Sequence, residues 1–384
     1  MGKNIIFCAD GTWNGPDQDE DHDLQPDPTN VYKLFLALDG RLDYELRQAD
    51  EQEKRLEEGG EAAQVAKYIH GVGDSRNPIV KLLGGAFGAG IISRIVRGYT
   101  FVSRNYQAGD RIVLAGFSRG AYTVRALGGL IGSQGLLAPE LTRDQGQAYR
   151  LGAKAWYQYR QDSRKQGIID RLTEVAADLP AFLSRDLLPA SSLVAGVKIE
   201  AIAVWDTVGA LGLPLYLRDR RIDAFRFADG VLAAKVEHGL HAVSLDEQRL
   251  DFTPTMWETR AGITQLLFPG AHADVGGGYP TGHRESGLSD LALRWMAEQL
   301  GGLGVRLTLP GFEPFNPDPG ATAHQPWRQP PFELGRTGLR DFGPPVVAAT
   351  GIGVHPAVGE RMASGPVLAD PAATPAPYRP ANLP

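Results

Sequence analysis

A serine between two glycines carries the strongest chemical signal in the sequence. Residues 116–120 fit the pattern G-x-S-x-G, with Ser118 at the centre. The apolar run 111–115 precedes this pattern and the small-residue run 121–131 follows it. A strand and a helix joined by such a turn present a strained serine, and small neighbours are needed where the backbone comes close. The pattern therefore predicts a nucleophile at Ser118.

An acid and a base that would complete a catalytic triad follow later in the chain. Asp206 comes directly after the apolar run 201–205, and His272 lies in a glycine-rich segment after the apolar run 263–268. Serine, acid and histidine in this order form one of the known chain orders of such triads. We predict that His272 takes the serine proton and that Asp206 orients the imidazole.

The negative charge that develops on a reacting carbonyl oxygen needs hydrogen-bond donors. The backbone amide of Arg119, at the start of the helix expected after Ser118, is the first predicted donor. Gly11 or Thr12, in the polar turn after the first apolar run, supplies the second predicted donor.

Three further polar residues are predicted to support the triad: Asp10, Asp274 and His241. His241 is the rival candidate for the base. The stretch 227–245 that contains it has helical patterning, so we interpret His241 as a buried histidine whose hydrogen bonds are satisfied.

A metal-assisted hydrolase is the main alternative. Asp10, Asp206, His272 and Asp274 are all expected at strand ends, and carboxylate oxygens and imidazole nitrogens suit divalent ions. Ser118 would then have no reason to lie in a nucleophile turn, so we rank this hypothesis second and expect neither cofactor nor metal. A third hypothesis is a binding module with an idle hydrolase-like site.

Alternating strands and helices must position these residues. Apolar runs at 4–9, 65–69, 111–115, 199–205 and 263–268 predict strands, with helical patterns between them and a closing helix over 288–300. This alternation predicts an α/β fold of the α/β-hydrolase type, with a mostly parallel central sheet flanked by helices. Cys8, the single cysteine, is interpreted as a buried residue of the first strand, and one cysteine cannot form an intrachain disulfide.

The expected domain organisation is a catalytic domain over 1–310 and a Pro-rich extension over 311–384 that packs on it. Sixteen of the 27 prolines lie from Pro310 onward, so little helix is expected there. The segments 140–195, with helical patterning, and 210–232 are candidate cap elements. The charged stretch 39–63 is interpreted as a solvated helix or surface excursion.

Composition narrows the classes of partner. The 384 residues carry a formal net charge of −6, which argues against nucleic-acid binding. No apolar run is long enough to span a bilayer, and the N-terminal run lacks the features of a signal peptide. The expectation is a chain made in the cytoplasm, with export without a cleaved signal left open. Four arginines follow the apolar residues 211–217 and suggest either an exposed face or contact with anionic lipid: Arg218, Arg220, Arg221 and Arg226.

The sequence also resembles a known family, the α/β-hydrolases of domain of unknown function 2235. That family includes the catalytic part of the first class of type VI secretion lipase effectors. The blocks that carry the resemblance span residues 7–14, 29–31, 71–73, 109–110, 116–122, 204–209, 240–247, 268–279 and 378–380. The resemblance implies a Ser–Asp–His triad, with Ser118 at the nucleophile position and Asp206 and His272 in the acid and base blocks.

Phospholipase activity of the A type is what the resemblance implies for the secreted effectors. We therefore expect a serine esterase that forms an acyl-enzyme, with phospholipid acyl esters as the favoured substrates. The expected partners are a small-molecule or lipid ester and a membrane surface contacted peripherally. The chain has no evident separate membrane-binding domain, which weakens the lipid and secretion expectations, and the sequence does not indicate an oligomeric state.

Overall fold

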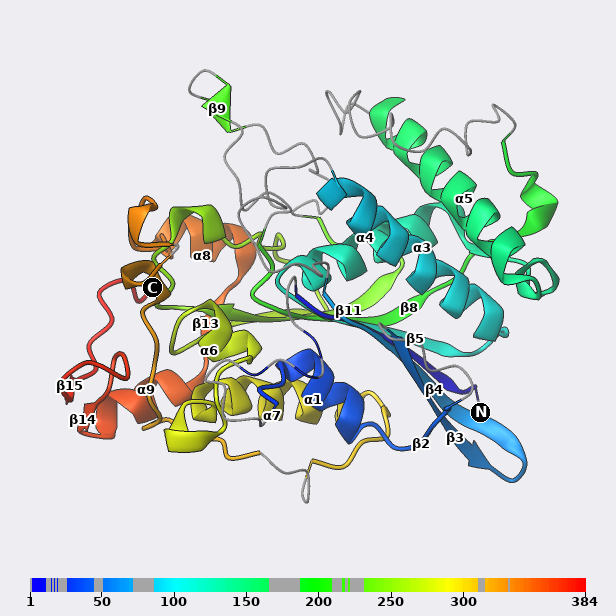
Figure 1. The fold of residues 1–384 in the computed structure, drawn as a ribbon. Coiled ribbons are helices and arrows are strands. Elements are labelled where there is room, and N and C mark those ends of the chain that lie inside the picture. Colours follow the sequence, from blue (N-terminus) through cyan, green and yellow to red (C-terminus); the bar gives the residue numbers. More distant parts are fainter. Residues whose placement is uncertain are drawn as a thin grey trace.

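A nine-stranded sheet runs through the centre of the computed structural model, and helices cover both of its faces (Figure 1). The strand order is β13-β12-β11-β8-β5-β1-β4-β3-β2. The structure describes residues 2–11, 15, 17, 19, 26–44, 51–71, 86–165, 187–208, 216–217, 220–221, 231–309, 315–330 and 332–384.

The strands of the central sheet are β1 (Asn4–Ala9), β2 (Arg41–Leu42), β3 (Glu51–Glu58), β4 (Glu61–Ile69), β5 (Arg111–Phe117), β8 (Ile199–Trp205), β11 (Val236–Ser244), β12 (Ile263–Phe268) and β13 (Gly353–Val354). Strands β1, β4, β5, β8, β11, β12 and β13 pair in parallel. The predicted α/β fold with a mostly parallel sheet is therefore confirmed.

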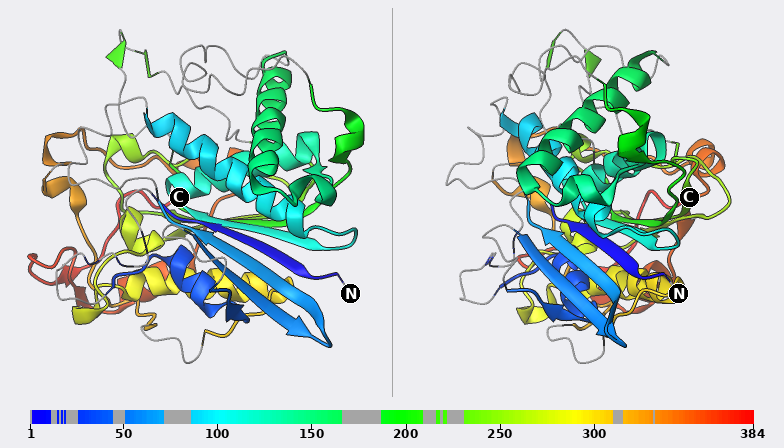
Figure 2. Two further views of the ribbon diagram at one scale, coloured as in Figure 1. Left: turned by 45° about the vertical axis from the view of Figure 1, so that its right-hand side comes forward. Right: turned by 90° about the vertical axis from the view of Figure 1, so that its right-hand side faces the viewer.

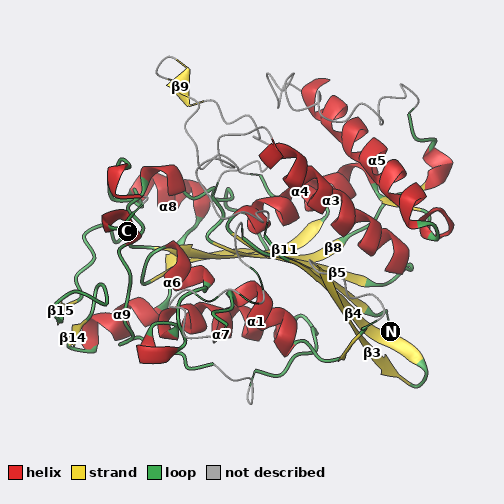
Figure 3. Ribbon diagram, viewed as in Figure 1, coloured by secondary structure: helices red, strands yellow, loops and turns green. Residues whose placement is uncertain are grey.

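The helices are α1 (Asn30–Ala37), α3 (Ala86–Asn105), α4 (Arg119–Gln134), α5 (Gln145–Lys165), α6 (His272–Gly276), α7 (Gly287–Gly302), α8 (Pro344–Thr350) and α9 (Pro356–Ala363). Helices α3, α4 and α5 lie on one side of the sheet, and α1, α6, α7 and α9 lie on the other (Figures 1 and 3). Two further views show the same layers around the twisted sheet (Figure 2). Within the described residues, no helix combines the length and apolarity needed to cross a membrane.

Strand β1 shows why the parallel strands read as continuous apolar runs. Ile5 and Phe7 belong to the hydrophobic core beneath α3 and α4, whereas Ile6 and Cys8 belong to the core beneath α1 and α7. Successive side chains of a strand point to opposite faces, so a sheet covered on both faces needs apolar residues at every position. Cys8 is fully buried in this strand, as predicted.

The charged stretch 39–63 contains no helix among its described residues, so the helical alternative for this stretch is wrong. It forms β2, β3 and the start of β4, and β3 runs antiparallel to both β2 and β4. The first half of β3 is buried, and Lys67 forms ion pairs with Glu51 and Glu53. Because the buried charges of β3 are paired, burial of its charged side chains is tolerated, which a hydrophobicity pattern cannot reveal.

The helical interpretation of 227–245 is also wrong for its described part, where β11 occupies 236–244. Short apolar runs that are buried on both faces do not distinguish a strand from a buried helix by their periodicity. Helix α5 fulfils the helical expectation for part of 140–195, whereas 166–186 lies outside the described residues. Of the second candidate cap segment, 210–232, the structure describes the short strands β9 (Tyr216–Leu217) and β10 (Arg220–Arg221) and residues 231–232, so the cap stays a prediction.

The Pro-rich extension contains more regular structure than expected. Helices α8 and α9 lie within it, and each has a proline in its first turn, where the missing N–H is not needed. Strand β13 adds to the sheet beside β12, and Phe342 and Val358 join Val243 and Leu267 in a buried cluster. The described part of the extension is thus built into the core. The division of the chain at residue 310 stays a prediction.

Candidate active site

Ser118 lies at the turn between β5 and α4, as the sequence predicts. Its backbone has φ 54° and ψ −120°, which is strained for a residue with a side chain. Its amide donates to the Trp205 carbonyl at 3.1 Å, so the turn is bonded to the neighbouring strand β8. Such strain persists only where the surrounding structure enforces it, and here it places a serine directly at the carboxyl edge of the sheet.

The two glycines beside Ser118 are required by close backbone approaches. A Cβ on Gly116 would come within 2.6 Å of the Gly120 backbone, and a Cβ on Gly120 would lie 2.0 Å from the Ala9 carbonyl oxygen. Both distances are too short for non-bonded atoms. The steric reason for the G-x-S-x-G pattern is therefore present in this chain.

Asp206 follows β8, the strand next to β5, and its carboxylate is fully buried. Its Oδ1 accepts from the Ser244 amide at 3.0 Å, and its Oδ2 lies 2.5 Å from His272 Nδ1. Arg340 donates to both oxygens. Burial alone would raise the pKa of Asp206, but the guanidinium of Arg340 and the contact with His272 together hold this pKa well below its usual range.

His272 is the first residue of α6, beyond the end of β12. Its ring packs against two phenylalanines, with ring centroids 4.6 Å from Phe117 and 5.0 Å from Phe252. Burial lowers the pKa of His272, and the hydrogen bond to Asp206 opposes that shift. A neutral imidazole that donates from Nδ1 to Asp206 keeps a lone pair on Nε2, as a general base requires.

The Nε2 atom of His272 is buried and has no hydrogen-bond partner among the described residues. Ser118 Oγ is therefore not bonded to it in this structure. Ser118 is close to the histidine through its neighbour Phe117, which contacts the His272 ring. Catalytic hydrogen bonds are often long before substrate binds and shorten in the complex.

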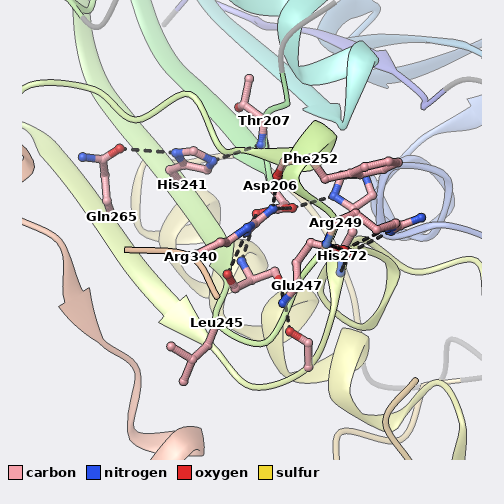
Figure 4. A network of polar contacts seen from close by, with 12 residues as sticks. Asp206, Thr207, His241, Leu245, Glu247, Arg249, Phe252, Gln265, His272 and Arg340 are labelled. Carbon is pink, nitrogen blue, oxygen red and sulfur yellow. Dashed lines mark hydrogen bonds and ion pairs between the residues drawn. The ribbon is translucent and has the colours of Figure 1, made fainter. Parts of the chain in front are cut away.

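The three predicted catalytic residues thus lie along one edge of the sheet. Ser118 follows β5, Asp206 follows β8 and His272 follows β12, and β5, β8, β11 and β12 are consecutive neighbours. Figure 4 shows His272 and Arg340 converging on the Asp206 carboxylate, with Phe252 beside the histidine. The arrangement provides an ionised acid and a neutral base next to a strained serine, while the assignment of catalytic roles stays a prediction.

His241 lies in β11 rather than in a helix, and it is fully buried. Its Nε2 accepts from the Thr207 amide at 3.1 Å, and its Nδ1 lies 3.3 Å from Gln265 Oε1. Burial is the main cause that lowers the pKa of His241 to about 3, so the ring is neutral. His241 therefore holds the backbone next to Asp206, as expected of a histidine whose hydrogen bonds are satisfied.

The predicted oxyanion donors are described in part. Arg119 is the first residue of α4, so its backbone amide lies in the first turn of that helix. The Gly11 amide donates to Asp10 Oδ1 at 2.7 Å, so it is engaged in this structure. Thr12 lies outside the described residues.

Asp10 is a buried carboxylate with neutral hydrogen-bond donors. Its Oδ2 accepts from Tyr68 Oη at 2.7 Å and from Thr29 Oγ1 at 2.8 Å. Burial raises the pKa of Asp10 to about 6, although these hydrogen bonds oppose the rise. Asp10 therefore fixes the loop after β1 by hydrogen bonds and does not contact Asp206.

Asp274 pairs with His324 of the Pro-rich extension, a residue to which the sequence assigned no role. His324 Nδ1 lies 2.7 Å from Asp274 Oδ1, and its Nε2 lies 3.1 Å from Glu285 Oε2. Burial lowers the pKa of His324, but the two carboxylates outweigh it and raise the pKa to about 9. A protonated His324 thus binds the extension to the segment that carries His272.

The four residues of the metal hypothesis do not form one cluster. Within the described residues, no group of three or more histidine, cysteine, aspartate or glutamate side chains could hold a metal ion. Asp206 and His272 bind each other, whereas Asp10 and Asp274 bind Tyr68 and His324 respectively. No geometric observation favours that hypothesis.

Sequence reasoning missed Arg340 and also the pair formed by Glu247 and Arg249. Glu247 accepts from the His272 amide at 3.2 Å and from Arg249, whose guanidinium stacks on Phe252 at 3.7 Å from the ring centroid. Glu247 stands inside one of the blocks that carry the family resemblance, which is the one signal that points to it. Arg340 lies in no recognisable motif.

Fold and site together define an α/β-hydrolase-like protein with a serine, an acid and a histidine at the edge of its sheet. Residues 3–299 match the family described as type VI secretion system phospholipase effector Tle1-like, catalytic domain. The chain belongs to this family, and the predicted resemblance is confirmed.

The individual relatives share 15–30% sequence identity with this chain, and each is longer than the part that it shares with the chain. The uncharacterized protein YEL023C of Saccharomyces cerevisiae is 30% identical over 272 residues, which cover 66% of this chain and 33% of that protein. A crystal structure of an uncharacterized protein from Pseudomonas aeruginosa gives a TM-score of 0.45 at 18% identity, over 83% of this chain and 49% of that one.

The Tle1 effector bound to the VgrG spike of the type VI secretion system gives a TM-score of 0.38 at 15% identity, over 73% of this chain and 52% of that one. The chain thus spans one third of the yeast relative and about half of each of the two solved structures.

Replacement of Gly120 by alanine tests the steric account of the turn. The added Cβ would lie 2.0 Å from a backbone oxygen, so we expect G120A to lower the free energy of unfolding by about 3 kcal/mol or more, measured by urea denaturation. G301A is the matched control, because a Cβ on that helical glycine meets nothing within 4 Å and is expected to stabilise by about 0.5–1 kcal/mol. Equal stability of the two variants would contradict the account.

The raised pKa of His324 predicts a pH dependence of stability. The folded state holds the His324 proton more tightly than the unfolded chain, so the stabilisation is complete below about pH 6.5 and is lost as pH rises through about 9. We expect the difference in free energy of unfolding between wild type and His324→Gln to be about 3 kcal/mol larger at pH 6 than at pH 10. His238→Gln, in a half-exposed position, is the control, and a pH-independent difference for His324→Gln would refute the ion pairs.

Proposed function

We propose that this chain is a serine esterase that cleaves carboxylic esters through an acyl-enzyme, with phospholipid acyl esters as its substrate class. The observation that carries the proposal is the buried contact between Asp206 and His272 beside the strained Ser118. Membership in a family of phospholipase-effector catalytic domains supports the choice of lipid esters.

The proposed reaction begins with Ser118. Its Oγ forms a bond to the ester carbonyl carbon while its proton passes to His272 Nε2. The Arg119 amide, together with an amide of the loop at Gly11 or Thr12, stabilises the oxyanion. The ester C–O bond then breaks, and His272 returns the proton to the departing alcohol.

Water completes the cycle. His272 takes a proton from a water molecule, which attacks the acyl carbon, and the released Ser118 Oγ regains the proton, so the products are a carboxylic acid and an alcohol. Asp206 stays ionised throughout, and its charge stabilises the imidazolium that forms twice in each turnover. The low pKa of Asp206 supports this role.

Labelling with a fluorophosphonate tests the proposal, because such probes react with activated serines. We expect wild type to be labelled and Ser118→Ala to be unlabelled, with turnover of short esters and of phosphatidylcholine vesicles reduced at least about 10⁴-fold. Ser133→Ala, at the exposed end of the same helix α4, is the matched control and should react like wild type.

A chelator arm separates the metal-assisted alternative, which predicts loss of hydrolysis with the chelator and survival of hydrolysis in Ser118→Ala. A folded wild type that is not labelled and hydrolyses no ester would instead favour the idle binding module. Hydrolysis of short esters without hydrolysis of phospholipid would remove the lipid substrate class and leave the esterase.

A further inference from the structure

Arg340 makes the most extensive set of contacts with the predicted catalytic acid. Its two terminal nitrogens donate to Asp206 Oδ1 at 2.7 Å and to Asp206 Oδ2 at 2.9 Å. The same nitrogens also donate to the carbonyls of Ser244 at 2.7 Å and Phe252 at 2.5 Å. Arg340 lies beyond residues 3–299, the part of the chain that matches the family.

The two hydrogen bonds from Arg340, referred to below as the fork, fix the orientation of the Asp206 carboxylate. A guanidinium that donates to both oxygens restrains the plane of a carboxylate, which a single donor cannot do. Each Asp206 oxygen then has one further partner, the Ser244 amide on Oδ1 and His272 Nδ1 on Oδ2. Arg340 therefore determines the direction from which Asp206 Oδ2 approaches the imidazole of His272.

The fork also compensates a buried charge. The Asp206 side chain is fully buried and that of Arg340 is 5% exposed. A buried carboxylate without a partner takes up a proton, because burial disfavours its charged form. With a bound cation it stays ionised and can accept from His272.

Backbone contacts hold Arg340 at this place. The Gly338 amide donates to the Gln248 carbonyl at 2.8 Å, and the Leu250 amide donates to the Arg336 carbonyl at 3.0 Å. Asn382 donates to the carbonyls of both Leu245 and Arg340. The C-terminal part of the chain is thus bonded along the loop that follows β11, and Arg340 enters the site from it.

We propose that Arg340 is a positioning residue that holds the Asp206 carboxylate, and through it the His272 ring, ready for base catalysis. The inference rests on the proposed function, because it assigns a role in that same reaction. It also means that the C-terminal segment outside the family match completes the site.

The charge of Arg340 has a measurable consequence for the pair formed by Asp206 and His272. Among the described residues, the other ionisable groups that face this pair are Glu247, Arg249 and the neutral His241. Loss of one cation favours uptake of a proton by the pair, whichever of its two members takes that proton. The unprotonated pair is the reactive form. Without the charge of Arg340, activity should therefore be lost on acidification at a higher pH than in wild type.

The test is the rate of fluorophosphonate labelling against pH for full-length wild type, Arg340→Gln and Arg340→Lys. Because the pKa of His272 is lowered, the wild-type rate should fall only below about pH 6.5. In Arg340→Gln, which loses the charge, this acid limb should move up by about one pH unit or more. Arg340→Lys keeps the charge but cannot donate two parallel hydrogen bonds. Its labelling rate should therefore fall at the same acid pH as that of wild type, while its plateau rate at higher pH should be about tenfold lower.

Arg361→Gln is the matched control. Arg361 is also buried in the same C-terminal region, but it donates its hydrogen bonds to the backbone carbonyls of Pro319, Ala321 and Leu368. Its loss should lower the thermal unfolding midpoint and leave the acid limb at the wild-type pH. A role of Arg340 in stability alone would produce the same result for both arginines.

An acid limb that does not move in folded Arg340→Gln would overturn the inference. If Arg340→Gln does not fold, the test relies on Arg340→Lys. A plateau labelling rate of Arg340→Lys equal to that of wild type would overturn the inference. Failure of the proposed function is distinguishable, because wild type would then show no labelling at Ser118 at any pH, which would remove this inference as well.

Discussion

The site depends on one buried contact, the 2.5 Å approach of His272 Nδ1 to Asp206 Oδ2. A carboxylate and an imidazole can share such a place only if the charge of the carboxylate is compensated. Arg340 supplies that compensation, and two phenylalanine rings pack against the buried imidazole. The fold around the pair brings these groups together from distant parts of the chain.

The carboxyl edge of the parallel sheet brings the residues of the site together. At two of its strand ends the backbone is strained. Ser118 and Asp206 both have positive φ, and the third described residue other than glycine with this property is Arg284. Ser118 is bonded to the end of β8, and the Asp206 amide donates to Ala242 of β11 at 2.7 Å. Each strained turn is therefore held by the next strand along the sheet, so the spacing of serine, acid and base follows from the order of the strands.

The sequence allowed the main strands and the positions of Ser118, Asp206 and His272 to be predicted, because apolar runs that end in polar residues indicate strand ends. The charged strand β3 and the strand β11 were misinterpreted, since the burial of β3 depends on ion pairs with distant residues and β11 has no distinctive period. Arg340 and His324 could not be predicted at all. Their roles arise from contacts across 134 and 50 residues of chain, and no local pattern records such contacts.

The most direct test of the account is a crystal structure of the fluorophosphonate adduct. We expect phosphorus bonded to Ser118 Oγ, the phosphoryl oxygen within hydrogen-bond reach of the Arg119 amide, and His272 Nε2 facing the adduct while Nδ1 stays on Asp206. An adduct on another residue, or an imidazole that has left Asp206 and points away from Ser118, would contradict the account.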